Sequence, residues 1–383
     1  MRLTLLDSVD TLTADQWNAL AGDTNPFLRH EFLVALERHQ CVGAAAGWWP
    51  QHLIVEHDGQ LIGAMPMYMK NNSYGEFVFD WDWADAYHRA GLRYYPKLVV
   101  AVPYTPATGS RLLLADTQQR AQVADLLISG AIEHAQRSNA SGLHWLFTNA
   151  ADTAHLARHG LLQRVGCQYH WENRGYRDFD DFLSQLSAEK RKKIKRERRH
   201  VNDAGVVLEL LDGHQTSAAQ WAIFHEFYKS TFDEKGGIAS LTLEFFKELG
   251  EAMPDQTLLI MASYQGQYVA GSFFLRGRDT LYGRHWGCTA QFHSLHFEAC
   301  YYRAIEYCIA QGLQRFEAGA QGEHKISRGF LPTPTYSMHW IANARFREAI
   351  DNFLVRETQS IEQYMHELKQ HSPYKSLFQS LGV

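Results

Sequence analysis

Two stretches of this 383-residue chain repeat one pattern, HLIVEHDGQLIGAMPMYMK at residues 52–70 and LLIMASYQGQYVAGSFFLRG at residues 258–277. In each stretch, apolar and polar residues alternate on both sides of a turn that contains glycine, Gly59 in the first and Gly266 in the second. Alternation around a tight turn predicts two antiparallel strands. The same hairpin signal therefore occurs once in each half of the chain.

The residues around each hairpin repeat as well. A Gln-Trp pair precedes the first hairpin at Gln16-Trp17 and the second at Gln220-Trp221, and each hairpin is followed by an amphipathic run that ends in a strand-like segment, SGLHWLF or QGLQRFE. Repetition of order and residue type predicts two copies of one α/β unit, each a mixed sheet packed with helices. We expect a first domain at 1–178 and a second at 179–383.

Composition is that of a folded protein with 45% hydrophobic and 21% charged residues. The net charge of −5 argues against general nucleic-acid binding. Five cysteines without a CxxC pair indicate a reducing compartment. The opening MRLTLLDSVD turns acidic too early for a leader peptide, and no apolar run reaches membrane-spanning length, so we expect a cytoplasmic protein.

One basic segment interrupts this acidic chain. KRKKIKRERR begins at Lys190 and, at helical spacing, forms a basic helix over 190–200 with Ile194 facing inward. It is either a solvated connection between the two copies or a contact for a phosphate-rich donor, for tRNA or for an anionic lipid. The candidate donor-binding residues are Lys192, Lys193 and Arg196.

The motif GAQGEHK, residues 319–325, supplies ionisable groups next to glycines that let the backbone pass close to a ligand. A carboxylate or imidazole here can act as a base, and nearby cations can hold an anion or a developing oxyanion. Simple pairing of Glu323 with Lys325 across a turn is the competing interpretation. The candidate catalytic residues are Glu323, His324 and Lys325, with Gln321 and Arg328 as substrate-binding neighbours.

Two further segments of the second half carry candidate substrate contacts. LYGRHWGC is a strand whose alternation sends Arg284 and Trp286 to one face and His285 to the other. LHFEACYYRAIEYC opens a helix over about 295–311, with Glu298 and Tyr302 in its first turns. The aromatic and charged neighbours in the strand fit either a substrate floor or an ordinary cation–π contact.

The first half contains an extra polar insertion with the string WDWADAY at residues 81–87. Carboxylates among aromatic rings can bind an amine or a sugar, although packing of an inserted loop explains the aromatics equally well. We expect this half to shape the acceptor pocket. The candidate residues are Asp80, Trp81, Asp85, Tyr87 and Tyr104.

Twenty histidines raise the question of a metal centre. The densest group lies in one short stretch, and its spacing matches no standard zinc arrangement. We therefore expect no metal. The group consists of His285, Cys288, His293, His296 and Cys300.

The strings WDWADAY, YYPKLVVAVPYTP, LYGRHWGC, LHFEACYYRAIEYC and FEAGAQGEHKISRGFLP together resemble the FemAB-like N-acyltransferases, a branch of the tandem-domain GNAT superfamily. The resemblance covers nearly the whole chain. It implies tandem GNAT-like domains and transfer of an acyl or aminoacyl group to an amine, with the donor between two splayed parallel strands. The basic segment resembles one that Fem-type aminoacyl transferases carry at the matching place.

The resemblance implies that the donor is either an acyl-CoA or an aminoacyl-tRNA. QFHSLHFE, before the second-half helix, lacks the glycines of the usual CoA-binding loop. The acceptor is a small-molecule or peptide amine. A non-catalytic protein that binds a lipid, a cell-wall precursor or tRNA on the same fold is the alternative.

Overall fold

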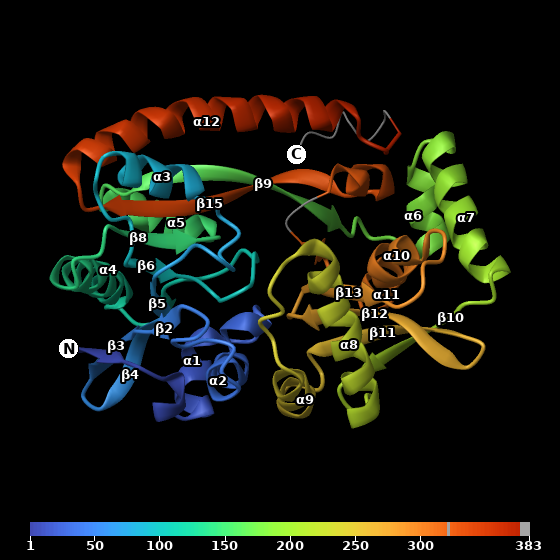
Figure 1. Ribbon diagram of the computed structural model, residues 1–383, viewed down its shortest axis with the longest axis horizontal. Helices are drawn as coiled ribbons and strands as arrows, with labels where there is room; N and C mark the ends of the chain where they lie inside the picture. Colours follow the sequence, from blue (N-terminus) through green and yellow to red (C-terminus); the bar gives the residue numbers. More distant parts are fainter. Residues whose placement is uncertain (320–321, 376–383) are drawn as a thin grey trace. The chain divides into compact units, whose positions relative to one another are not determined.

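The computed structural model describes residues 1–319 and 322–375 and has a mixed α/β architecture (Figure 1). The chain forms two compact units. Unit 1 comprises 1–167 and 334–364, and unit 2 comprises 168–333 and the described residues from Met365 onward. Two strands change unit along their length, β9 (Leu162–Glu172) and β15 (Leu331–Ile341). The expected division into two consecutive domains, 1–178 and 179–383, does not describe this exchange of strands between the units.

Unit 1 contains two groups of strands. Four antiparallel strands lie in the order β1-β3-β4-β7, and the strands of this unit in the larger sheet follow the order β15-β8-β6-β5-β2. Within that group β6 and β8 are parallel. The bounds are β1 (Arg2–Leu6), β2 (Trp48–Pro50), β3 (His52–His57), β4 (Gln60–Met65), β5 (Met67–Lys70), β6 (Lys97–Val100), β7 (Leu113–Leu114) and β8 (Gly142–Leu146).

The first repeated stretch forms the predicted hairpin. β3 and β4 pair antiparallel, and the turn residues Asp58 and Gly59 both have positive φ, 51° and 77°. This backbone matches the twist of tight hairpins. Pro66 separates β4 from β5; because proline has no N–H to donate to a ladder, the chain leaves the first sheet here and β5 joins the second.

Helices and short 3-10 segments complete unit 1. The long helix α4 buries Val123, Leu127 and Ala131 against β3 and β4, in a core where each large apolar side chain contributes about 1.5–3 kcal/mol. The expected loop around WDWADAY is instead helix α3. The bounds are η1 (Val9–Thr11), α1 (Ala14–Ala21), η2 (Pro26–Leu28), α2 (His30–Arg38), α3 (Trp81–Arg89), α4 (Arg120–Arg137), α5 (Ala150–Arg158) and α12 (Ala344–Gln370), the last ending in unit 2.

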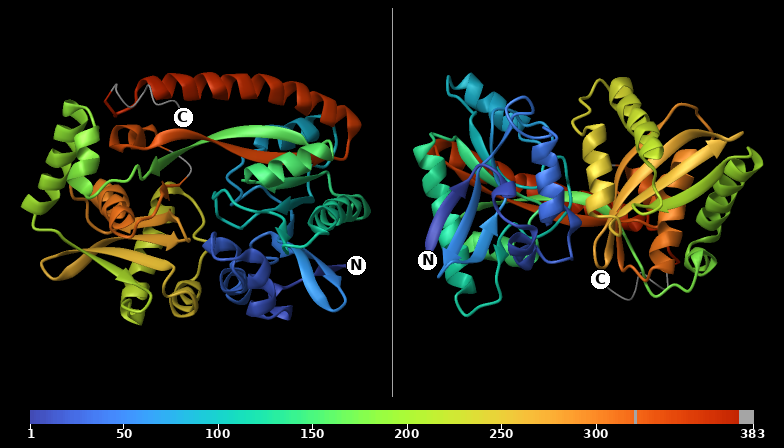
Figure 2. Two further views of the ribbon diagram at one scale, coloured as in Figure 1. Left: turned by 180° about the vertical axis from the view of Figure 1, so that it is seen from behind. Right: turned by 90° about the horizontal axis from the view of Figure 1, so that it is seen from below.

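Unit 2 repeats the arrangement. Its strands follow the order β10-β11-β12-β13-β14-β9, and only β13 and β14 are parallel in this part of the sheet. α8 and α9 lie on one face, and α7 and α11 on the other (Figure 2, right). The strand bounds are β10 (Val207–Asp212), β11 (Thr257–Tyr264), β12 (Gln267–Arg276), β13 (Thr280–Cys288) and β14 (Arg315–Glu317).

The predicted helix near 295–311 is present, with a π-helical turn inside it. Such turns insert an extra residue and are frequent at functional sites. The helical bounds in unit 2 are α6 (Phe179–Gln185), α7 (Ala188–Asp203), α8 (Ala218–Lys235), α9 (Leu243–Ala252), α10 (Leu295–Phe297), the π-helix η3 (Glu298–Tyr302), α11 (Arg303–Ala310) and the 3-10 helix η4 (Glu323–Arg328).

The repeated Gln-Trp pairs have one structural role in both units. Gln16 closes a capping box with Thr13 at the start of α1, and Gln220 does the same with Ser217 at the start of α8. A capping box satisfies two backbone N–H groups that the first turn leaves open. The tryptophan that follows each glutamine is buried. The repeat therefore preserves a helix start and a core anchor, which confirms the predicted tandem α/β fold.

In the part of the chain that the structure describes, no helix combines the length and apolar character that a bilayer crossing needs.

Candidate functional site

The candidate site of unit 2 follows the parallel pair of strands. β13 and β14 are paired only from Thr280–Arg315 to Tyr282–Glu317, after which β14 ends while β13 continues to Cys288 beside β12. The segment after β14 leads into η4, which begins with Glu323, His324 and Lys325 and has Gly322 as its N-cap; residues 322–325 are called the GEHK residues below.

Two glycines set the course of this segment. Gly322 has φ 116°, and a Cβ there would lie 2.5 Å from Cε1 of His324. Gly329 ends η4 with φ 97°, and a Cβ there would lie 2.8 Å from the ring of Phe182. Only glycine fits such positions without strain or collision. The glycines thus hold η4 against α6 and bring the His324 ring onto the backbone.

His324 is exposed at the start of η4, and Nε2 of its ring lies 3.0 Å from the Tyr301 hydroxyl, within hydrogen-bond distance. Partial burial, together with the charges of Arg328, Lys325 and Lys193, holds the pKa of the imidazole below its ordinary value of 6.5. The ring is therefore mostly neutral at pH 7, the state in which it can accept a proton.

Lys325 is buried, only 2% exposed, next to this imidazole in sequence. Its Nζ donates to the carbonyl oxygen of Gly319 at 3.0 Å. Burial lowers the pKa of the ammonium to about 8, with a smaller opposing effect from the Cys300 thiol. The side chain is thus a cation near neutral pH in a place where water screens its charge weakly.

All three nitrogen atoms of the Arg328 guanidinium donate hydrogen bonds. Nη2 donates to both carboxylate oxygens of Glu197, at 2.9 and 3.0 Å, and Nε donates to the Tyr302 hydroxyl at 3.0 Å. Nη1 donates to the carbonyl oxygen of His324 at 2.7 Å, and the guanidinium stacks 3.4 Å above the Phe297 ring. Arg328 therefore fixes η4 in place and is not available as a free anion-binding group.

Glu197 was not among the candidates, and it is the acid inside the basic segment. It lies on α7 three residues after Ile194, so both face inward with Val201. The Tyr302 hydroxyl donates to it. The segment 190–199 has this one carboxylate among eight lysines and arginines. A carboxylate is costly to bury unless it is paired, so the isolated acid is the signal in the sequence that indicates a buried ion pair.

The predicted basic helix is α7, with Ile194 fully buried as expected. Lys192 and Arg196 are exposed and Lys193 is half-buried; none of the three has an acidic partner within 1–319 and 322–375. Lys193 lies near enough to His324 to lower its pKa. The helix therefore presents free cations on the unit that carries the GEHK residues.

A pocket of about 740 Å³ lies beside α7, between α6 and α11. Its lining includes Lys195 and Arg198, which are already paired with Asp180 and Glu306. No residue of η4 lines it. The pocket is therefore separate from the candidate residues at 323–328.

The other candidates of unit 2 lie in different surroundings. Glu298 is buried and paired with Arg198 at 2.9 Å, and Tyr302 belongs to the Arg328 network. Glu323 is exposed on the first residue of η4. Gln321 lies outside the described residues.

The strand candidates depart from simple alternation because β13 has a bulge. The ladder pairs His285 with Phe273 and Gly283 with Phe274, so the register skips Arg284. His285 packs against Tyr228 of α8 at 4.8 Å, and burial lowers the pKa of its imidazole far below 6.5. The Trp286 ring contacts the ring of His296 on α10. Bulges re-aim side chains in this way.

In unit 1, the structure separates the expected acceptor residues. Asp80 is buried, whereas Trp81 is exposed beside Tyr74 and Asp85 is exposed in an ion pair with Arg89 at 2.6 Å. Tyr87 is buried against Phe346, and the Tyr104 hydroxyl donates to the carbonyl oxygen of Cys41. The five residues do not form one surface.

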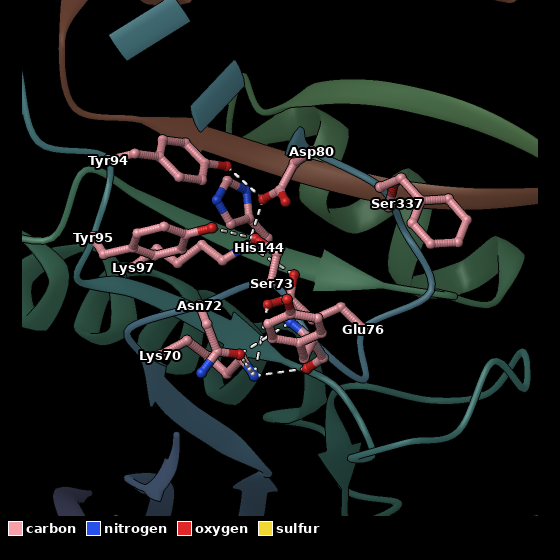
Figure 3. Close-up of polar contacts among 12 residues, drawn as sticks. Lys70, Asn72, Ser73, Glu76, Asp80, Tyr94, Tyr95, Lys97, His144 and Ser337 are labelled. Atoms are coloured by element: carbon pink, nitrogen blue, oxygen red, sulfur yellow. Dashed lines mark hydrogen bonds and ion pairs between the residues drawn. The ribbon is translucent and has the colours of Figure 1, made fainter. Parts of the chain in front are cut away.

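Asp80 belongs to a buried ionic network drawn in Figure 3. Lys97 Nζ donates to Asp80, to Glu76 at 2.8 Å and to Ser73 at 2.9 Å, and the Tyr94 hydroxyl donates to Asp80 at 2.5 Å. Burial raises the pKa of Glu76 to about 7. For Asp80 burial is also the largest effect and acts in the same direction, but the charge and hydrogen bond of Lys97, together with His144 and Ser73, outweigh it and the pKa falls to about 2. The network anchors the start of α3.

Two histidines lie beside this network, with the His144 ring stacked on the ring of Tyr94. His144 on β8 and His339 on β15 share a hydrogen bond of 2.8 Å between their Nδ1 atoms, and Ser337 contacts Nε2 of His339 at 2.9 Å. Burial lowers the pKa of His144 to about 3 and that of His339 well below 6.5. Both rings are neutral, and their role in the described structure is to join two strands.

The two units each contain a parallel strand pair, β6 with β8 and β13 with β14, and together they define a duplicated α/β protein. The chain belongs to the FemAB-like family, described as peptidoglycan biosynthesis/recognition, which matches residues 8–376. Family and fold together point to a transferase. No curated protein sequence matches the chain significantly.

Several solved structures share the fold. FemX has 11% sequence identity and a TM-score of 0.57, with 92% of this chain and 100% of FemX covered. The C-terminal domain of a candidate lysylphosphatidylglycerol synthetase from Agrobacterium fabrum has 8% identity and a TM-score of 0.53, covering 90% of this chain and 95% of that one. L-PGS from Bacillus licheniformis has 10% identity and a TM-score of 0.51, covering 84% and 94%. At such identities the likeness concerns the fold alone.

Proposed function

We propose that this protein is an N-acyltransferase that moves an acyl or aminoacyl group from an activated carrier to an amine, with the reacting groups on unit 2. Membership of the FemAB-like family supports a peptidoglycan precursor as the source of the amine. The observation that carries the proposal is the neutral imidazole of His324 beside the buried ammonium of Lys325 on η4.

The reaction has defined chemical needs. The amine nitrogen attacks the carbonyl carbon of the carrier ester or thioester, and the carbonyl oxygen gains negative charge as the C–N bond forms. When the oxyanion collapses, the bond to the carrier oxygen or sulfur breaks and the carrier leaves with a proton. The nitrogen must lose a proton, and the oxyanion needs a positive partner.

His324 is the base in this proposal. Its lowered pKa keeps the ring able to accept a proton at pH 7, and the hydrogen bond to Tyr301 orients it. Glu323 is the alternative base, since it is exposed next to His324. The imidazole is preferred because its proton affinity lies closer to neutral pH.

Lys325 stabilises the oxyanion. With a pKa of about 8 it is charged at pH 7, and its burial strengthens the attraction to a negative oxygen. Arg328 acts as a positioning residue, because its donors are committed to Glu197, Tyr302 and the His324 carbonyl.

We assign an aminoacyl-tRNA as the donor in preference to an acyl-CoA. The unpaired cations of α7 favour the longer polyanion, and Lys193 connects them electrostatically to His324. A donor of either kind belongs to the cytoplasm, so the proposal includes a cytoplasmic location. Trp81 and Asp85 remain proposed acceptor contacts, because they are exposed on α3.

The test supplies purified protein with aminoacyl-tRNA or acetyl-CoA and with a peptidoglycan-precursor peptide that contains a free amine, and follows the product by mass spectrometry. We expect a new amide product that His324→Ala reduces at least about 100-fold. His214→Ala, which removes an exposed imidazole from the same unit, is the matched control and should leave the rate unchanged. Binding of donor or precursor without any product would favour the non-catalytic alternative.

A further inference from the structure

Three side chains in unit 1 converge outside the candidate site already described. His155 on α5 and His159 at its C-terminal cap each place Nε2 2.8 Å from Oδ1 of Asp125 on α4. The two imidazole rings stack with their centroids 5.7 Å apart. In the part of the chain that the structure describes, this is the only group of three or more histidine, cysteine or carboxylate side chains close enough to share one ion.

We propose that Asp125, His155 and His159 form a binding site for a divalent first-row transition ion of the zinc type. Two imidazole nitrogens and one carboxylate oxygen are ligands that Zn²⁺ prefers, and three protein ligands leave a fourth position for water. Imidazoles select zinc, nickel, copper or cobalt over magnesium and calcium.

The distances fit such an ion after a small adjustment. Zinc bonds of about 2.0–2.1 Å in tetrahedral geometry separate two ligand atoms by about 3.3 Å. The present nitrogen–oxygen distances of 2.8 Å therefore need to lengthen by roughly half an ångström. Asp125 can supply this movement because its side chain is 54% exposed, whereas the two histidines are 14% and 23% exposed and are held by the protein.

The sequence spacing supports the same inference. His155 and His159 are an H-x-x-x-H pair, and residues four apart lie on one face of a helix. The group between residues 285 and 300, on which the expectation of no metal rests, does not include this pair. The third ligand, Asp125, comes from α4, and local spacing does not connect it to the two histidines.

Arg158 gives the site a built-in competitor. Its Nη2 donates to Nδ1 of His155 at 2.5 Å. A guanidinium only donates, so this bond requires an unprotonated Nδ1 and leaves the proton of the neutral ring on Nε2, which faces Asp125. Coordination through Nε2 requires the proton to move to Nδ1 and Arg158 to swing away. Arg158 is exposed and free to do so.

The bound ion would connect α4 to the C-terminal end of α5. Because the ion binds the folded arrangement of the two helices, it should stabilise the protein by an amount that grows with the logarithm of its concentration relative to Kd. Binding of the ion does not depend on the proposed acyl transfer.

The experiment titrates the full chain, freed of metal, with Co²⁺ and follows the visible absorption of the ion, and then displaces Co²⁺ with Zn²⁺. We expect one ion per chain. His155→Ala, His159→Ala and Asp125→Asn should each weaken binding by at least about 100-fold, more than the 10–100-fold typical of losing an outer-shell partner. Zn²⁺ should raise the Tm of the unsubstituted protein but not of these variants.

Two further variants separate this site from general surface binding. Arg158→Gln should tighten binding several-fold, a gain that misfolding cannot produce. His214→Ala breaks an exposed histidine–aspartate pair of similar length, 3.0 Å, that has no second histidine, and should leave binding unchanged. The proposal is overturned if the three ligand variants bind Co²⁺ as the unsubstituted protein does, or if no stoichiometric ion binds.

Discussion

The guanidinium of Arg328 and the carboxylate of Glu197 form a buried pair, with Nη2 2.9 and 3.0 Å from the two carboxylate oxygens and the residues 2% and 6% exposed. The pair joins α7 to η4, the helix that carries His324 and Lys325. The basic helix and the candidate catalytic residues are therefore parts of one connected structure within unit 2.

Glu197→Ala should reduce the free energy of unfolding by about 3–5 kcal/mol, because it leaves a buried guanidinium without its counter-ion. Urea unfolding followed by circular dichroism measures the loss. The double variant Glu197→Met with Arg328→Met should be less destabilised than either single variant. Additive losses would contradict a coupled pair.

The proposed roles predict a bell-shaped dependence of kcat/KM on pH. His324 must be unprotonated, so the rate should fall as the pH drops through a value below 6.5. Lys325 must be protonated, so the rate should fall again above about 8. Lys325→Arg keeps the charge at all these pH values and should remove the alkaline limb. An unchanged alkaline limb in that variant would exclude Lys325 as its cause.

The buried network of unit 1 should depend on its central cation. Lys97→Met leaves the Asp80 carboxyl buried without its cation, and should cost about 3–5 kcal/mol of unfolding free energy. Adding Asp80→Asn should recover part of this loss. Lys229→Met removes a comparable but exposed ion pair with Glu226 and should cost less than about 1 kcal/mol in the same urea assay. Equal losses at the two sites would contradict the account.

Acid should destabilise the protein through the neutral histidine His144. Its pKa is about 3 in the folded chain against 6.5 for an ordinary histidine, so between these values the unfolded chain binds more protons. The stabilising contribution is complete above pH 6.5 and is lost as the pH falls toward 3. The variant His144→Gln has no imidazole at this position and therefore lacks this pH-dependent contribution to stability. The stability gap between the two proteins should narrow by about 2–3 kcal/mol from pH 7.5 to pH 4.5 in urea unfolding; a constant gap would contradict it.

The cations of α7 should affect donor binding but not folding. Replacing Lys192, Lys193 and Arg196 with Glu should weaken tRNA binding and reduce the slope of log K against log salt by about 2–3. Anionic vesicles, tested in parallel, distinguish a lipid contact. A matched triple variant of exposed cations on α12, Arg345, Arg356 and Lys369 to Glu, should leave tRNA binding unchanged. If both triple variants changed tRNA binding equally, α7 would be only a solvated connection between the two copies and not a donor-binding helix.

Local patterns predicted the repeat, the hairpins, the helix near 295–311 and the inward side of α7, because each depends on neighbours within a few residues. The Gln-Trp pairs repeat because each closes a capping box and buries a tryptophan. The candidate catalytic residues at 323–325 are predictable because Gly319 and Gly322 precede them in the sequence.

Long-range pairings were not predictable in this way. Glu197 and Arg328 are 131 residues apart, and nothing in their local spacing links them. Local spacing also does not indicate the exchange of β9 and β15 between units. The same holds for the contact between His144 and His339 across two strands. The local sequence around Asp80 predicts a substrate contact, because nothing near this carboxylate indicates that Lys97 binds it.

The most direct measurement is a single-turnover transfer rate at saturating donor for the unsubstituted protein, His324→Ala and Lys325→Met, each with its Tm. The account predicts rates at least about 100-fold lower for both variants, with Tm of His324→Ala unchanged because that side chain is exposed. Transfer at the full rate in both folded variants would contradict the assignment of the reaction to η4.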